Sequence, residues 1–99
     1  GACVLQVVNG YETFADDPLH KRRAQDTLRA YTYQRFLKDT SRPEVLLELA
    51  MTKAVVRALD AVSEFSEGRV RRFGLMGYSK LGTATYMAAA VDPRVTAIA

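Results

Sequence analysis

Three short runs of apolar and β-branched residues along the chain predict three β-strands. The first run covers residues 3–8 and stops at Asn9-Gly10, which is a turn signal. The second run covers residues 70–76, and the third covers residues 95–99. The first run has few polar interruptions, which is typical of a strand covered on both faces of a parallel sheet, whereas the second has Arg71 and Arg72 at its start. We expect the three strands to form a parallel sheet.

Longer stretches with apolar positions three and four residues apart predict three helices between the strands. Residues 24–38 contain no Gly or Pro and carry an imperfect apolar stripe. A second helix is expected from a capping box at Ser41 and Glu44 to a C′ stop at Gly68, and its many apolar positions predict burial on most sides. The third, marked by apolar positions between residues 81 and 91, is rich in alanine and ends before a turn.

The order of these expected elements is β-α-α-β-α-β, which predicts an α/β fold with three parallel strands joined by right-handed crossovers. A parallel sheet must be covered by helices on both faces and flanked at its edges. Three helices are too few for that task. We therefore expect residues 1–99 to be a fragment of a single larger domain.

The amino-acid composition mainly excludes classes of protein and kinds of site. The 48% apolar and 25% charged residues are ordinary for a globular protein, and the net charge of +3 is too small to indicate nucleic-acid binding. The single cysteine, Cys3, excludes an internal disulfide framework and a cysteine-based metal cage. No apolar run approaches the roughly 20 residues of a membrane-spanning helix. We expect no metal, no cofactor, no nucleic-acid partner and no membrane-spanning segment.

The segment Gly77-Tyr78-Ser79-Lys80-Leu81-Gly82 lies where the second expected strand meets the third expected helix. A tight strand–turn–helix exposes a serine hydroxyl beside the amides at a helix start, which can hold an oxyanion. The common pattern is G-x-S-x-G, whereas here the second glycine comes one residue later. The segment predicts Ser79 as a nucleophile and the Lys80 backbone N–H as an oxyanion donor, with its ammonium adding charge. The alternative is a glycine-bounded turn with an incidental serine and a solvated lysine.

The other members of a catalytic triad are not evident. In serine hydrolases with this turn the acid and the histidine follow the serine along the chain. After Ser79 there is only Asp92, which is better placed to form a turn or helix end, and no histidine. His20 precedes Ser79 in a polar, basic loop, and Asn9 either lines a pocket or forms a plain turn. The acid and base are therefore expected outside these 99 residues, or the protein is not a triad enzyme.

Residues 77–82, followed by an Ala-rich helix and the A-V-D-P-R-V segment within residues 88–98, resemble the PhoPQ-activated pathogenicity-related protein family. Residues 51–62 are similar to the preceding helix of that family. Residues 5–9 resemble its strand that ends in Asn, and residues 26–36 resemble its next helix. The resemblance therefore covers nearly the whole chain in the same order, and it implies the central part of an α/β-hydrolase fold around a nucleophile elbow.

The resemblance implies part of a serine hydrolase that cleaves esters, with Ser79 as the elbow serine, Lys80 as its neighbour, and Tyr78 and Asn9 near the substrate. The elbow also resembles that of glucuronoyl esterases, which suggests a small-molecule or carbohydrate-linked ester as substrate. Family members are commonly exported, so a periplasmic or secreted location is expected. The isolated 99 residues are expected to be inactive without the rest of the parent chain. The alternatives are a non-catalytic envelope or binding protein and, last, a cofactor-binding domain, whose G-x-G-x-x-G pattern is missing.

Overall fold

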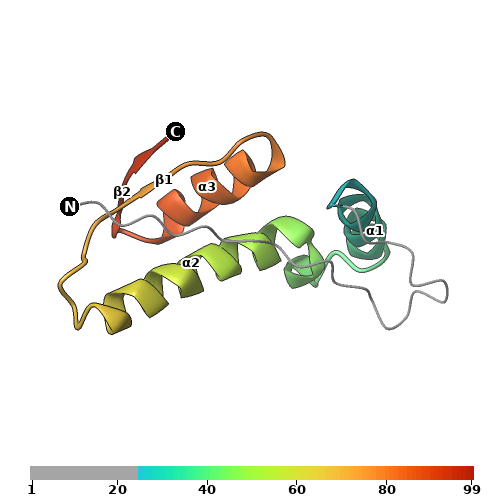
Figure 1. Ribbon diagram of the computed structural model, residues 1–99. Helices are drawn as coiled ribbons and strands as arrows, with labels where there is room; N and C mark the ends of the chain where they lie inside the picture. The colour runs from blue at the N-terminus through green and yellow to red at the C-terminus, as the bar shows by residue number, and fades with distance from the viewer. Residues whose placement is uncertain (1–24) are drawn as a thin grey trace. The chain divides into compact units, whose positions relative to one another are not determined.

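The computed structural model describes residues 25–99, and helices predominate in them (Figure 1). A short 3-10 helix lies between the helices α1 (Gln25–Lys38) and α2 (Leu47–Phe65), one short strand lies between α2 and α3 (Lys80–Val91), and a second strand follows α3. The 3-10 helix is η1 (Pro43–Val45), and the strands are β1 (Phe73–Leu75) and β2 (Val95–Ile98). None of the helices in this part of the chain is long and apolar enough to cross a membrane.

The expected α/β fold with three parallel strands in β-α-α-β-α-β order is wrong: residues 25–99 hold three α-helices and only two short parallel strands. The first expected strand, residues 3–8, lies outside the described residues. The second expected strand, residues 70–76, is shorter in the structure and covers only β1, because its first residues belong to the turn after α2. The Ser66 hydroxyl accepts a hydrogen bond from the Val70 amide at 3.0 Å, so that amide is used by the turn and not by a strand.

The two strands pair in parallel and are connected through α3 (Figure 1). Phe73 lies opposite Val95 and Leu75 lies opposite Ile98, with an irregularity in register after Phe73. Backbone hydrogen bonds continue past the strand ends. The Ala99 amide donates to the Leu75 carbonyl at 2.9 Å, and the Gly77 amide donates to the Ala99 carbonyl at 3.1 Å. The sheet thereby fixes the position of the chain just before α3.

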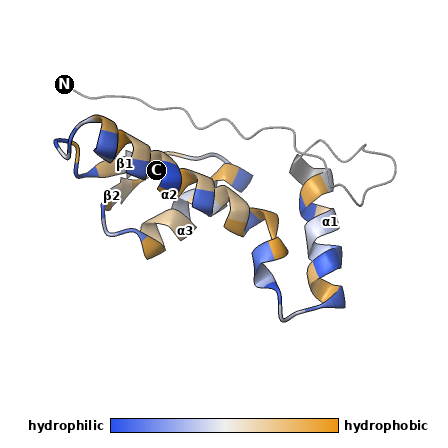
Figure 2. Ribbon diagram, turned by 90° about the horizontal axis from the view of Figure 1, so that it is seen from below, coloured by the Kyte–Doolittle hydropathy of each residue, from blue (hydrophilic) through white to orange (hydrophobic). Residues whose placement is uncertain are grey.

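Two compact units divide the described residues, 25–50 and 51–99, with their boundary inside α2. In residues 51–99 the buried apolar side chains are Met51, Leu59, Ala84 and Ala88. Four of the twelve residues of α3 are alanine, and the helix is largely apolar in Figure 2. The prediction that the second helix is buried on most sides is wrong for residues 51–65, because most of them are half-buried or exposed and Phe65 is 92% exposed.

The unit of residues 25–50 is centred on Thr32, whose side chain is fully buried. Its hydroxyl donates to the Arg29 carbonyl at 2.8 Å and accepts from the Leu47 amide at 3.2 Å. Arg29 also forms an ion pair with the buried Glu48. These bonds tie α1, which the sequence predicted over nearly the same residues, to the start of α2.

The expected capping box at the start of the second helix is wrong. The Ser41 hydroxyl donates to the Asp39 carboxylate at 2.5 Å and its amide donates to the same oxygen at 3.1 Å, while Glu44 pairs with Arg42. Ser41 bonds to the Asp39 carboxylate instead of capping the helix, because Asp side chains readily accept hydrogen bonds from the backbone two residues later in the chain. The segment begins as η1 without a side-chain cap, and α2 starts at Leu47.

The end of α2 differs from the prediction by one residue. The Gly68 amide donates to the Ser63 carbonyl at 2.8 Å, and the Glu67 amide donates to the Glu64 carbonyl at 2.9 Å. This pair of bonds is a Schellman motif, in which the residue at C′ takes the left-handed conformation. That residue is Glu67, with φ of 56°, and Gly68 follows at φ of 76°. The predicted glycine stop is therefore present but occupies the next position.

Candidate functional site

Ser79 lies between β1 and α3, at the N-cap of α3, and is exposed. Its backbone has φ of 55° and ψ of −121°, and its side chain makes no capping hydrogen bond to the helix. Positive φ is uncommon for a residue with a Cβ atom and is maintained only where the surroundings hold it. The strand–turn–helix that the sequence predicted around the serine is thus present, with Ser79 at its strained corner. We call residues 77–82 the Ser79 turn.

Gly77 is the residue that allows the Ser79 turn to pack against α3. A Cβ atom at this position would lie 2.4 Å from the Thr85 Oγ1 atom and 2.5 Å from the Leu81 carbonyl oxygen. No side chain fits in that space unless the neighbouring atoms shift, so the packing of the turn requires glycine two residues before the serine. Gly82 is less constrained, since a Cβ atom there would lie 3.4 Å from the Gly77 carbonyl oxygen.

Backbone hydrogen bonds close the turn on its helix side. The Leu81 amide donates to the Tyr78 carbonyl at 3.1 Å, and the Gly82 amide donates to the Ser79 carbonyl at 2.9 Å. On the strand side, the Gly77 amide is held by Ala99 as described above. The residues on both sides of Ser79 are therefore tethered, which accounts for the persistence of its positive φ.

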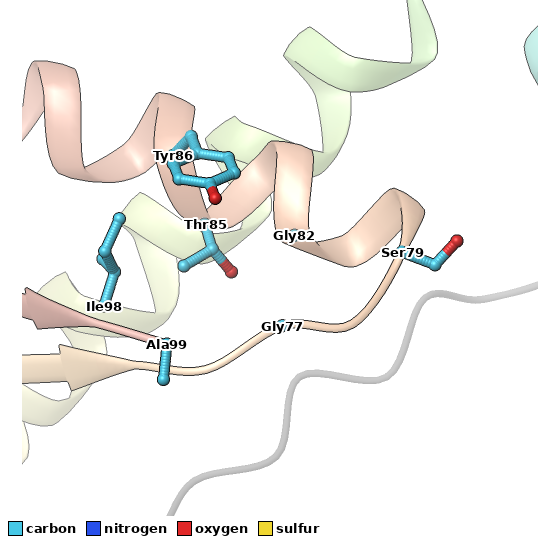
Figure 3. A pocket seen from close by; sticks show the side chains of 7 residues that line it. All are labelled: Gly77, Ser79, Gly82, Thr85, Tyr86, Ile98 and Ala99. Carbon is cyan, nitrogen blue, oxygen red and sulfur yellow. The ribbon is translucent and has the colours of Figure 1, made fainter.

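A hollow of about 240 Å³ adjoins the Ser79 turn. It is lined by Gly77, Ser79, Gly82, Thr85, Tyr86, Ile98 and Ala99. Figure 3 shows the Ser79 side chain pointing away from the side chains of Thr85, Tyr86 and Ile98. The backbone of Ser79 thus contributes to the hollow, while its hydroxyl is directed to the outside.

Lys80 and Tyr78 flank the serine in different settings. Lys80 is the first residue of α3, so its backbone stands at the end of the helix where the dipole is positive. Tyr78 is 89% exposed. The oxyanion role predicted for Lys80 and the substrate contact predicted for Tyr78 stay predictions.

Asp92 lies at the opposite end of α3 from Ser79, where it is the C-cap residue. Its buried carboxylate accepts hydrogen bonds from the Arg94 guanidinium at 2.6 and 2.9 Å. These bonds hold the pKa of Asp92 below its ordinary value. Arg94 also donates to Asp60 at 2.7 Å and so joins α2 to the turn before β2. Asp92 is therefore structural, in agreement with its predicted turn or helix-end position.

The remaining candidates from the sequence, Asn9, His20 and Cys3, lie outside the described residues. Within residues 25–99 there is no group of three or more His, Cys, Asp or Glu side chains that could hold a metal ion.

The sequence analysis did not identify the residues of α3 and β2 that lie around the Ser79 turn. Thr85 follows Leu81 by one helical repeat, and that spacing could have placed it beneath the turn. The expected parallel strands place residues 95–99 at the same sheet edge as the turn, but the register that brings Ile98 and Ala99 to the hollow depends on the pairing of β2 with β1.

Comparisons with known proteins agree with the resemblance noted in the sequence. The sequence model of the PhoPQ-activated pathogenicity-related protein family matches residues 2–99. The chain is 46% identical over 98 residues to autocrine proliferation repressor protein A of Dictyostelium discoideum. That match covers 96% of this chain and 19% of the relative, so the chain spans about a fifth of the relative's length. No solved structure matches the chain.

Proposed function

The chain belongs to the PhoPQ-activated pathogenicity-related protein family, and from that premise we propose that it carries the nucleophile of a serine hydrolase that cleaves esters. The observation that supports this proposal most is the conformation of Ser79. Ser79 is exposed, lies at the corner between a strand and a helix, and has φ of 55°, which stores strain of about 1–3 kcal/mol in a residue with a Cβ atom, as the serine of a strained strand-to-helix elbow does.

The chemistry follows from this placement. The Ser79 hydroxyl attacks the ester carbonyl and transfers its proton to a base. The product of this addition is a tetrahedral intermediate whose former carbonyl oxygen carries a negative charge. The Lys80 backbone N–H, at the start of α3, donates to that oxyanion in the proposed mechanism, and the helix dipole favours its negative charge. Collapse of the intermediate releases the alcohol, and water then hydrolyses the acyl-serine.

The proposal requires a general base, which is histidine in serine hydrolases of this kind, and residues 25–99 contain no histidine. We propose that the base, the acid that orients it and the second oxyanion donor come from other parts of the protein. The substrate class that we propose is a small-molecule or carbohydrate-linked ester, with Tyr78 beside it. Tyr78 precedes the nucleophile along the chain and is 89% exposed, so a ligand can reach it.

A second candidate function is a non-catalytic binding role. It is favoured by the relative from Dictyostelium discoideum, whose name describes repression of proliferation and no hydrolysis. In that case the Ser79 turn is retained for structural reasons, and the serine hydroxyl has no chemical task.

Reaction of the full-length protein with a fluorophosphonate probe separates the two candidates. We expect covalent labelling of the wild type and none of Ser79→Ala. Ser41→Ala is the matched control, because Ser41 is also exposed but bonds to Asp39, and this variant should label as the wild type does. Labelling that persists in Ser79→Ala would eliminate Ser79 as the nucleophile. Absence of labelling in the folded wild type would favour the binding role.

A further inference from the structure

We propose that Thr85 is the positioning residue that holds Ser79 in its positive-φ conformation. This inference rests on the proposed function, in which Ser79 is the nucleophile, and adds a residue that does not touch the substrate.

Thr85 is a buried polar residue with a defined partner. Its side chain lies in α3 with 7% of the residue exposed, and its hydroxyl donates to the Leu81 carbonyl at 3.0 Å. A hydrogen bond from a threonine hydroxyl to the carbonyl of the preceding turn adds little stability to a helix and tends to bend it. A buried threonine at this position is therefore better explained by what its side chain contacts than by helix stability.

The contact is with the strand side of the Ser79 turn. The space above the Gly77 Cα atom is filled by Thr85 and Leu81, since a Cβ atom there would lie within 2.4 and 2.5 Å of their oxygens. Figure 3 shows the Thr85 side chain between α3 and the segment that passes through Gly77. Gly77 is held from the other direction by its hydrogen bond to Ala99. Thr85 thus sets the separation between the end of the strand and the beginning of the helix.

Ser79 lies between these two fixed sides, and a strained φ persists only when both of its sides are held. Removal of the Thr85 side chain opens the space next to the Gly77 Cα atom and frees the Leu81 carbonyl from its hydrogen bond to the threonine hydroxyl. The turn can then relax, and the Ser79 hydroxyl leaves the position that the reaction needs. A displacement of about 1 Å at a reacting group can lower a rate by about 100-fold, so a clear kinetic effect is expected.

The test compares Thr85→Ala, Thr85→Ser and Thr83→Ala in the full-length protein. Thr85→Ser keeps the hydroxyl and tests rescue. Thr83 is in the same helix and half-buried but does not line the hollow, so Thr83→Ala controls for loss of a threonine in α3. We expect Thr85→Ala to lower the second-order rate of fluorophosphonate labelling at least about ten-fold, whereas the other two variants stay within about two-fold of the wild type.

Amide hydrogen exchange provides a readout that does not depend on catalysis. The Gly82 amide, bonded to the Ser79 carbonyl, reports on the turn, and the Asp92 amide, bonded to the Ala88 carbonyl, reports on the far end of α3. We expect Thr85→Ala to accelerate exchange at Gly82 and to leave Asp92 unchanged. Equal acceleration at both amides would indicate general destabilisation and overturn the proposal. If Ser79 of the wild type reacts and Thr85→Ala is labelled at the same rate, the proposal is overturned as well. If the wild type does not label, the proposed hydrolase function fails, and exchange alone decides the role of Thr85.

Discussion

Substitution of Gly77 by alanine should destabilise the protein far more than the same substitution at Gly82. The Cβ atom of Gly77→Ala would lie 2.5 Å from the Leu81 carbonyl oxygen and 2.4 Å from the Thr85 Oγ1 atom, separations that real Cβ atoms essentially never show. The Leu81 oxygen belongs to the backbone of α3, so it cannot move without moving the helix. Gly77 cannot retreat either, because its amide is bonded to Ala99 at 3.1 Å.

Overpacking of a buried site costs about 1–3 kcal/mol when side chains can adjust. Because two backbone segments must separate here, we expect Gly77→Ala to lower the free energy of unfolding by about 3 kcal/mol, at the upper end of that range. In Gly82→Ala the new Cβ atom would meet the Gly77 oxygen at 3.4 Å, which is ordinary contact, and alanine is favoured over glycine in a helix by up to about 1 kcal/mol. Gly82→Ala should therefore stay within about 1 kcal/mol of the wild type.

Urea unfolding of the full-length protein, followed by circular dichroism, measures both variants against the wild type. The double variant Gly77→Ala/Thr85→Ala adds a further check. It removes the contact with the threonine but not the one with the Leu81 backbone, so it should recover only part of the loss. A Gly77→Ala variant as stable as Gly82→Ala would refute the close packing of the Ser79 turn on α3.

Three further predictions concern strain and charge in the same unit. Ser79→Gly should raise the free energy of unfolding by about 1 kcal/mol relative to Ser79→Ala, because glycine adopts φ of 55° without strain; equal stabilities in urea would contradict the strained conformation. Glu67→Gly should stabilise the end of α2 by up to about 1 kcal/mol through relief at the left-handed C′ position, and a lower melting temperature than the wild type would argue against the Schellman motif. The Asp92 carboxylate, whose pKa is lowered by hydrogen bonds from Arg94, adds stability that is present above its unfolded pKa of about 3.9 and is lost as the pH falls through its folded pKa. In Asp92→Asn the free energy of unfolding should therefore fall less steeply as the pH drops below about 4 than it does in the wild type. The same pH dependence in both proteins would show that the Asp92–Arg94 pair does not contribute.

Much of the local structure could be predicted from the sequence because it depends on near neighbours along the chain. The absence of Gly and Pro over residues 24–38 predicted α1, and the alanine-rich segment predicted α3. Errors occurred where two local signals compete. Ser41 has both Asp39 and a helix start within reach, and its hydroxyl binds the carboxylate. The limits of β1 were likewise misjudged, since the amide of Val70 bonds to a turn.

For the candidate site, the sequence alone determined the chemistry that is present: a serine hydroxyl followed by a lysine, with a glycine two residues before it, at a junction between a strand and a helix. Only the tertiary structure decided that Ser79 has positive φ, that Gly77 lies against Thr85, and that Ile98 and Ala99 line the adjoining hollow. The physical reason is that the conformation of one residue is not set by its own preferences when both of its sides are held. The bond from Gly77 to Ala99 on one side, and the packing of α3 on the other, arise only when β2 returns to pair with β1.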